Sequence, residues 1–453
     1  MNNAAPPLSD TREGSAISTG RMGLLFTVML VTAAGNTAMQ SVMPSIGTAL
    51  EVDDFWISLA YSWSALLWVV CAPIWARRSD RRGRKAMMAL GLTGFIFSMG
   101  LCGLVLWAGL AGWITAFWTL IAFAAARSLY GGFGSAAPPA VQAYVASRTP
   151  RAERTQALSL IASSFGLGTV IGPVLAPLMV VSFLGVGLTG PFISFALIGV
   201  IALVLLRFRL PNDEPQFAAR GKTYGMPDAG QTQPDDNHRH TDHEDDDALP
   251  APPGSETRLR WFEPRLRPWV IAALLGGHAQ AMIMGITGFL VLDRLGLRDS
   301  PEEGAALVSL VLVFGALATL LAQWGVIPRF KIGPRAATLS GMLVAAFGTA
   351  ILGAADSVFA LSTGYAIASL GFGLFRPGTT AGTSLAVSRA EQGQASGVVA
   401  SVAGASFIYA PALGVGLYGI SDWLGFGLVI ALCLLVFILG WRSLTSDEIL
   451  TAD

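Results

Sequence analysis

Long apolar stretches separated by short polar segments make up most of this 453-residue chain. Most of them approach the ~20 consecutive apolar residues that an α-helix needs to cross a bilayer. Twelve such stretches can be placed, six on each side of a long polar region. The pattern predicts an all-α integral membrane protein with twelve transmembrane helices. These helices are expected at residues 22–48, 55–76, 85–108, 114–146, 153–181, 188–208, 268–292, 303–327, 337–355, 360–387, 395–418 and 424–442.

The two groups of helices define the expected domains. One six-helix bundle should occupy residues 22–208 and a second one residues 268–442, with cytoplasmic tails at 1–21 and 443–453. The segment 209–267 is rich in Asp, Pro, Gly and His and lacks apolar periodicity. We therefore expect a disordered cytoplasmic linker between the bundles.

The charge pattern along the chain sets the expected orientation. Lys plus Arg equals Asp plus Glu, at 29 each, so the chain lacks the basic surplus that a nucleic-acid partner would require. If the N-terminus is inside, all but four of the basic residues fall in cytoplasmic segments. The positive-inside rule therefore predicts a multi-pass protein of the cell inner membrane with both termini in the cytoplasm.

The two halves also repeat each other in sequence. The pattern Arg151-Ala152-Glu153 recurs as Arg389-Ala390-Glu391, and Pro173 matches Pro411 at the same offset. Parallel six-helix repeats of this kind build one large class of secondary transporters. We therefore expect two parallel-repeat six-helix bundles that rock about a central site.

A charged segment between the second and third predicted helices resembles the loop signature of the major facilitator superfamily, Gly-x-x-x-Asp-Arg-x-Gly-Arg-Arg or Lys. Ala76 replaces the first glycine, and the equivalent segment 325–335 of the second half has no acid. The resemblance implies a loop that latches the two halves on the cytoplasmic side. The alternative is a basic loop that only sets topology and contacts anionic lipid. The matching residues are Asp80, Arg81, Gly83, Arg84 and Lys85.

Two further elements resemble motifs of the superfamily, and the second of them resembles a motif of its drug–proton antiporters. Arg127 begins an Arg-x-x-x-Gly element in the fourth predicted helix. Gly168, Gly172 and Pro173 resemble the antiporter signature Gly-x-x-x-Gly-Pro-x-x-Gly-Gly, although 176–177 is Ala-Pro. The resemblance implies a proton relay through Arg127 and a glycine element that seals the outward route. A buried arginine bound to helix carbonyls and a plain packing seam are the alternatives.

Polar side chains inside the apolar spans predict a positively charged cavity. No acidic residue lies in the middle of a predicted span, and an arginine there costs about 2.5–3.5 kcal/mol, so it should face a cavity or a partner. Such a site should prefer anionic or zwitterionic compounds, and Arg376 is expected to bind the anionic group. The predicted cavity residues are Asn36, Gln40, Arg127, Gln142, Tyr144, His278, Gln280 and Arg376.

Proton coupling requires a group whose protonation follows the transport cycle. His278 is the only histidine in a predicted span, and Asp293 lies at the outer end of the same helix. Together with Arg127, these residues are the predicted coupling groups. The alternative for His278 is a hydrogen-bonded packing residue.

The central linker carries His238, His240 and His243 beside several carboxylates. This tract has the composition of a weak zinc or nickel site, but an acidic solvated segment is the favoured interpretation, because nothing imposes a defined geometry on these side chains. We expect no cofactor and no resident metal ion.

The resemblance and the cavity charge predict a monomeric secondary active transporter. Its expected activity is proton-coupled efflux of a drug, siderophore-like chelator or metabolite by alternating access. Proton-coupled uptake of an organic acid is the alternative within transport. A membrane enzyme or receptor is a distant third, because no Ser/His/Asp, paired-carboxylate or phosphate-binding constellation is found. The expected partners are the small-molecule substrate, protons and the lipid bilayer.

Overall fold

The computed structural model describes the chain outside residues 1–16, 149–150, 181–185, 212–262, 388–391 and 451–453, and leaves out a few side chains inside helices. Helices dominate the described residues, as the apolar pattern predicts. The first half holds α1 (Thr19–Ala49), α2 (Asp54–Arg82), α3 (Arg84–Leu110), α4 (Ala116–Gly132), the short 3₁₀ turn η1 (Gly134–Ala136), α5 (Ala137–Arg148), α6 (Arg151–Met179) and α7 (Gly190–Arg209).

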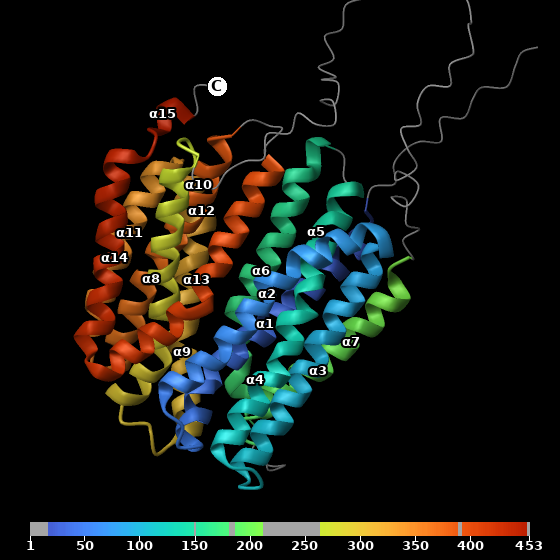
Figure 1. Ribbon diagram of the computed structural model, residues 1–453, viewed down its shortest axis with the longest axis vertical. Coiled ribbons are helices and arrows are strands. Elements are labelled where there is room, and N and C mark those ends of the chain that lie inside the picture. Colours follow the sequence, from blue (N-terminus) through green and yellow to red (C-terminus); the bar gives the residue numbers. More distant parts are fainter. Residues whose placement is uncertain (1–16, 149–150, 181–185, 212–262, 388–391, 451–453) are drawn as a thin grey trace, which may run out of the picture.

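The second half also provides six spans. It contains α8 (Arg267–Arg294), α9 (Pro301–Leu320), a π-helical turn η3 (Leu321–Val326), α10 (Ile327–Phe330), α11 (Pro334–Gly353), α12 (Val358–Leu385), α13 (Gln392–Ile420), α14 (Asp422–Ser443) and the short α15 (Asp447–Leu450). In Figure 1 the first half, blue to green, lies beside the second half, yellow to red.

The predicted spans are found within a few residues of their expected ends. Within the described ranges, ten helices are long and apolar enough to cross a membrane. The fourth predicted span is built from α4, η1 and α5 in succession, and the fifth is α6, which includes the apolar stretch Gly166–Met179. The described residues therefore form a multi-pass membrane protein with the twelve expected spans.

One predicted connection is much shorter than expected. The charged segment after residue 76 does not form a loop, because α2 continues to Arg82 and α3 begins at Arg84. Only Gly83 separates them, and its φ of 89° is a conformation that glycine adopts without a steric penalty. A helix can continue beyond an apolar span when charged side chains make its extension soluble in water. The end of the apolar stretch therefore did not mark the end of α2. The side chains of Asp80 and Arg81 lie outside the described residues.

The two halves touch through closely packed small residues. Gly288 of α8 lies against Pro44 of α1, where an added Cβ would come within 2.5 Å of the proline Cγ. An added Cβ on Gly416 of α13 would lie 3.1 Å from the ring of Phe55 near the start of α2. The connections from α1 to α2 and from α8 to α9, near these contacts in sequence, lie at the end of the molecule opposite α15 (Figure 1). The halves are therefore packed closely together at that end.

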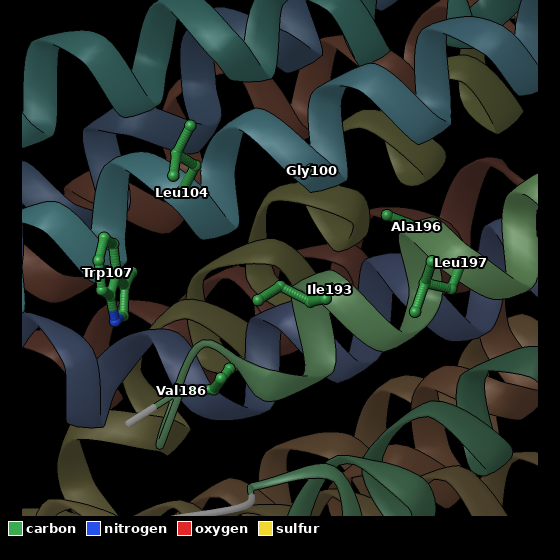
Figure 2. Close-up of a pocket in the computed structure, with 7 residues that line it drawn as sticks. All are labelled: Gly100, Leu104, Trp107, Val186, Ile193, Ala196 and Leu197. Atoms are coloured by element: carbon green, nitrogen blue, oxygen red, sulfur yellow. The ribbon is translucent and has the colours of Figure 1, made fainter. Parts of the chain in front are cut away.

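An apolar groove of about 470 Å³ lies between α3 and α7 (Figure 2). Leu104 is 56% and Leu197 is 61% exposed, so these faces would meet lipid tails in a membrane. No charged side chain lines the groove. A charged ligand therefore finds no charged partner there, and we look for the candidate site elsewhere. The lining residues are Gly100, Leu104, Trp107, Val186, Ile193, Ala196 and Leu197.

Candidate functional site

Arg127 is the most deeply buried of the predicted cavity cations. It lies in α4, and its side chain is almost fully buried at 3% exposure. One terminal nitrogen, Nη2, donates to Oδ1 of Asn36 in α1, and the guanidinium lies 4.4 Å from the centre of the Tyr130 ring. Its Nε and Nη1 are buried with no hydrogen-bond partner among the described residues. Because arginine remains protonated in proteins, the site holds a positive charge with two unused donors.

Arg376 has the opposite setting. It lies in the C-terminal half of α12, and its side chain is exposed. Thr380, one turn further along the same helix face, is exposed as well. No hydrogen bond or ion pair joins the Arg376 side chain to another described residue. The neighbouring face of α12 is buried, since Phe375 packs on Gly276 of α8. Arg376 is therefore held by a packed helix but leaves its own charge unpaired within the described chain.

The remaining predicted cavity residues fall into two groups. Gln40 and Gln280 are half-buried on α1 and α8, and Gln142 is exposed on α5. Tyr144, also on α5, is fully buried in an apolar cluster, where the guanidinium of Arg148 lies 3.9 Å from its ring centre. The ring of Tyr144 is thus part of the packing of the first half.

His278 is half-buried in α8 and makes one backbone contact. Its Nδ1 lies 2.6 Å from the carbonyl oxygen of Leu274, four residues earlier, and its ring centre lies 5.0 Å from that of Tyr409 in α13. This pairing is what a packing histidine makes. However, Nε2 is also buried and has no partner in the described part of the chain. One ring nitrogen therefore stays available for a proton or a ligand.

The glycines of α6 form a seam against α1. A Cβ on Gly168 would lie 2.6 Å from the Cβ of Ala33, and one on Gly172 would overlap the hydroxyl of Thr37. That hydroxyl donates to the carbonyl oxygen of Gly168 over 3.2 Å. The two backbones approach closely because neither glycine carries a side chain. Pro173 follows within the same helix and is buried.

Lys85 binds the end of another helix in its own half. Its Nζ donates to the carbonyl oxygen of Arg207 over 2.9 Å and to that of Leu210, both at the C-terminal end of α7. The last carbonyls of a helix have no intrahelical donor and carry partial negative charge, so a buried ammonium stabilises them. This part of the signature therefore ties α3 to α7. The preceding Arg84 also has a partner.

The second half obtains its missing acid from outside the predicted segment. Asp447, in α15, accepts hydrogen bonds from the backbone N–H groups of Arg335 over 2.7 Å and Ala336 over 3.1 Å. These are the first free donors of α11. Arg335 in turn donates to the carbonyl oxygen of Trp441 near the end of α14. In both halves, a basic residue at the start of the third span, α3 or α11, thus contacts the end of the sixth span, α7 or α14.

Asp293 lies in a charged cluster at the end opposite α15. Its Oδ1 accepts from Nε of Arg298 over 2.7 Å, and its Oδ2 accepts from the hydroxyl of Tyr418 over 2.8 Å. Arg298 also donates to both carboxylate oxygens of Asp54, over 2.8 and 2.6 Å, and to the hydroxyl of Thr48 over 3.0 Å. These contacts join residues of both halves.

The charge of Arg298 is strongly stabilised in this cluster. Hydrogen bonds to Asp54 raise the pKa of its guanidinium above the usual value, partial burial acts against this rise, and Asp293 adds to it. The side chain is 33% exposed, so water and ions reach the cluster.

No group of three or more metal-binding side chains occurs among the residues that the structure describes. The predicted linker site of His238, His240 and His243 lies outside them.

The membrane spans, the repeated order of helices and the motif positions agree with one family of proteins. The sequence model of the Major Facilitator Superfamily matches residues 25–331, which is more than half of the chain. The chain belongs to the Major Facilitator Superfamily. It is therefore a membrane transporter and not an enzyme, as the sequence predicted.

Three curated relatives share part of the sequence. Identity is 27% over 192 residues with the "Probable actinorhodin transporter" of Streptomyces coelicolor, covering 42% of this chain and 30% of that protein. It is 31% over 163 residues with the "Multi-drug resistance efflux pump PmrA homolog" of Lactococcus lactis, covering 36% of each. The chain thus spans less than half the length of these two relatives. A match at 26% identity over 464 residues covers 91% of this chain and 81% of a "Triacylglyceride transporter" of Mycolicibacterium hassiacum.

Solved structures with little sequence identity share the fold. The inward open xylose transporter XylE from E. coli has a TM-score of 0.64 at 14% identity, covering 94% of this chain and 96% of that one. The human organic anion transporter MFSD10 has a TM-score of 0.60 at 18% identity, covering 92% and 98%. The predicted twelve-helix major facilitator fold is thereby confirmed.

Arg298 was not among the site residues predicted from the sequence. It is one of the four basic residues that fall outside the cytoplasmic segments, and Asp293 was predicted as a coupling group at the outer end of a span. Unlike charges at the same membrane surface were the available signal. The partners of Arg298 are far apart in sequence, so the pairing required the folded chain.

Proposed function

We propose that this transporter exports a small organic compound with an anionic or zwitterionic group, coupled to protons, by alternating access in the cell inner membrane. Both termini would lie in the cytoplasm, as the basic residues of the connecting segments indicate. The end closed by Arg298 would then face outward. We further propose that the protein works as a monomer.

The unpaired positive charge of Arg376 is the observation that carries this proposal. An arginine that faces lipid from within a span would be costly, so we place Arg376 and Thr380 on the water-filled path between the halves. Arg127 adds two buried donors that no described residue accepts. Guanidinium groups bind carboxylates and phosphates through two parallel hydrogen bonds. An anionic group on the substrate would complete both sites.

The membrane potential supports the direction of transport. Its negative interior drives an anion outward with about 2.3 kcal/mol per charge for each 100 mV. Two of the relatives described above are named for actinorhodin transport and multi-drug efflux, which fits export. The third relative described above is named for triacylglyceride, so the proposal concerns a charge class and not one compound.

For proton coupling we propose Arg127, His278 and Asp293. Within the spans, the proton would bind to Nε2 of His278, which is buried without a partner among the described residues. Asp293 already bridges Arg298 and Tyr418, so a proton on its carboxylate would weaken both contacts. A change in either residue should alter the response to an imposed pH gradient more than simple substrate exchange.

The test is transport by purified protein in proteoliposomes, with pH gradient and voltage set separately. The substrates are a panel of anionic, neutral and cationic compounds. We expect Arg376→Ala to reduce transport of anions by roughly 10- to 100-fold, the value of a lost charged hydrogen bond, and that of neutral compounds much less. Arg376→Lys should retain part of the activity.

Arg442→Ala is the matched control, because Arg442 is an exposed arginine at the end of α14 in the same half. It should transport like the parent protein. Equal losses of anionic and neutral transport in Arg376→Ala would contradict the charge argument. Movement of the compound in the same direction as the protons, down the imposed pH gradient, would contradict export and favour organic acid uptake.

A further inference from the structure

Arg298 bridges the two halves from the connection between α8 and α9. On one side it binds Asp54 at the start of α2 with two hydrogen bonds, and Thr48 near the end of α1 with a third. On the other side it binds Asp293, in α8 of its own half. The neighbouring Arg294 differs, since its partners Asp356 and Asp422 both belong to the second half. The side chain of Arg298 thus joins the two halves at the outer end, where they must be in contact when that end is closed.

We propose that Arg298 and Asp54 form a releasable latch, and that this contact sets the balance between the outward-closed and outward-open states. The inference rests on the proposed alternating access. When the outer end opens, Arg298 leaves Asp54 and Thr48 and remains bound to Asp293.

The structure indicates which contacts break. Arg298 and Asp293 are five residues apart at the same helix end, so they move together. The hydroxyl of Tyr418 holds the other oxygen of Asp293 and thereby ties α8 to α13 within the second half. Asp54, in contrast, begins α2 of the first half. Separation of the halves therefore crosses the Arg298–Asp54 pair and leaves the Asp293 contacts intact.

The latch is also weak enough to open. The side chains of Arg298 and Asp54 are 33% and 23% exposed, so water can replace each lost hydrogen bond. Partly exposed ion pairs stabilise a contact only modestly, because water and salt screen the charges. The apolar contacts of the same region, such as Gly288 with Pro44, also favour closure, but they involve no charged groups. The bidentate pair adds a defined orientation to that contact.

The test measures conformation and needs no substrate. Ala111→Cys, after α3, and Ser357→Cys, before α12, place spin labels on exposed positions of the two halves at this end. Cys71, the only half-buried cysteine, is changed to Ser in this background, and Cys102 and Cys433 remain buried. Double electron–electron resonance in lipid nanodiscs then gives the fraction of molecules with the longer, open distance.

Asp54→Asn should raise the open-to-closed ratio by roughly 5- to 30-fold, the range for a partly exposed charged contact. Arg298→Gln should do the same, and the double variant should add little, because both remove one interaction. Asp53→Asn is the matched control: it removes a charge one residue away, and asparagine keeps the helix cap that Asp53 gives to Phe55. Asp356→Asn removes an ion pair inside the second half only.

Equal distances in Asp54→Asn and its parent would overturn the latch. An equal shift in Asp53→Asn would also overturn it, since net charge alone would then explain the effect. Failure of anion export in proteoliposomes, with the Asp54→Asn shift intact, would refute the proposed substrate class and leave the latch standing.

Discussion

Gly168 in α6 provides a quantitative test of the helix seam. The change is Gly168→Ala, which adds one methyl group 2.6 Å from the Cβ of Ala33 in α1. Carbon atoms in contact are normally about 3.5–4.0 Å apart, so α1 and α6 would have to separate by about 1 Å. Gly166→Ala makes the same change two residues earlier, where the nearest atom is a methyl group of Leu320 at 3.5 Å. The two variants differ mainly in the space available.

The expected free-energy difference follows from two opposing effects. Alanine in place of glycine stabilises a helix by up to about 1 kcal/mol, and both variants gain this equally. Overpacking a close contact costs about 1–3 kcal/mol, and only Gly168→Ala suffers it. Gly168→Ala should therefore be about 1–3 kcal/mol less stable than Gly166→Ala.

Thermal unfolding in detergent, followed by intrinsic fluorescence at a fixed scan rate, measures this difference. We expect an apparent Tm for Gly168→Ala several degrees below that of Gly166→Ala, and lower transport activity if the seam must stay closed in the cycle. Equal Tm values for the two variants would refute the idea that Gly168 is required for close helix approach.

Two further predictions concern the helix ends. Lys85→Met leaves two carbonyl groups of α7 without their donor, so it should cost about 1–3 kcal/mol and lower the Tm, whereas the exposed Arg82→Met should not. Equal Tm values in these variants would speak against the cap. Asp447→Ala should cost about 1 kcal/mol and speed hydrogen exchange of the Arg335 and Ala336 amides. Unchanged exchange at both amides would show that Asp447 does not hold α11.

Much of the fold follows from local sequence. A bilayer imposes a length and an apolar composition on each span, and both can be read in a window of about twenty residues. The twelve spans were predictable for this reason. The same reasoning fails at the end of α2, because charged residues can extend a helix into water, and the loop predicted between residue 76 and Lys85 is helical instead. Only the turn at Gly83 remains.

The candidate site divides in the same way. The sequence determined that Arg127, Arg376 and His278 lie within spans, since their apolar neighbours can be read directly. Only the tertiary structure decided that Arg127 binds Asn36 and keeps two donors unused, and that Arg298 connects α1 and α2 to α8. Such pairs depend on how the helices cross, which hydrophobic pattern does not encode. A charge is therefore located by its own span, whereas its partner is determined by the packing of the whole bundle.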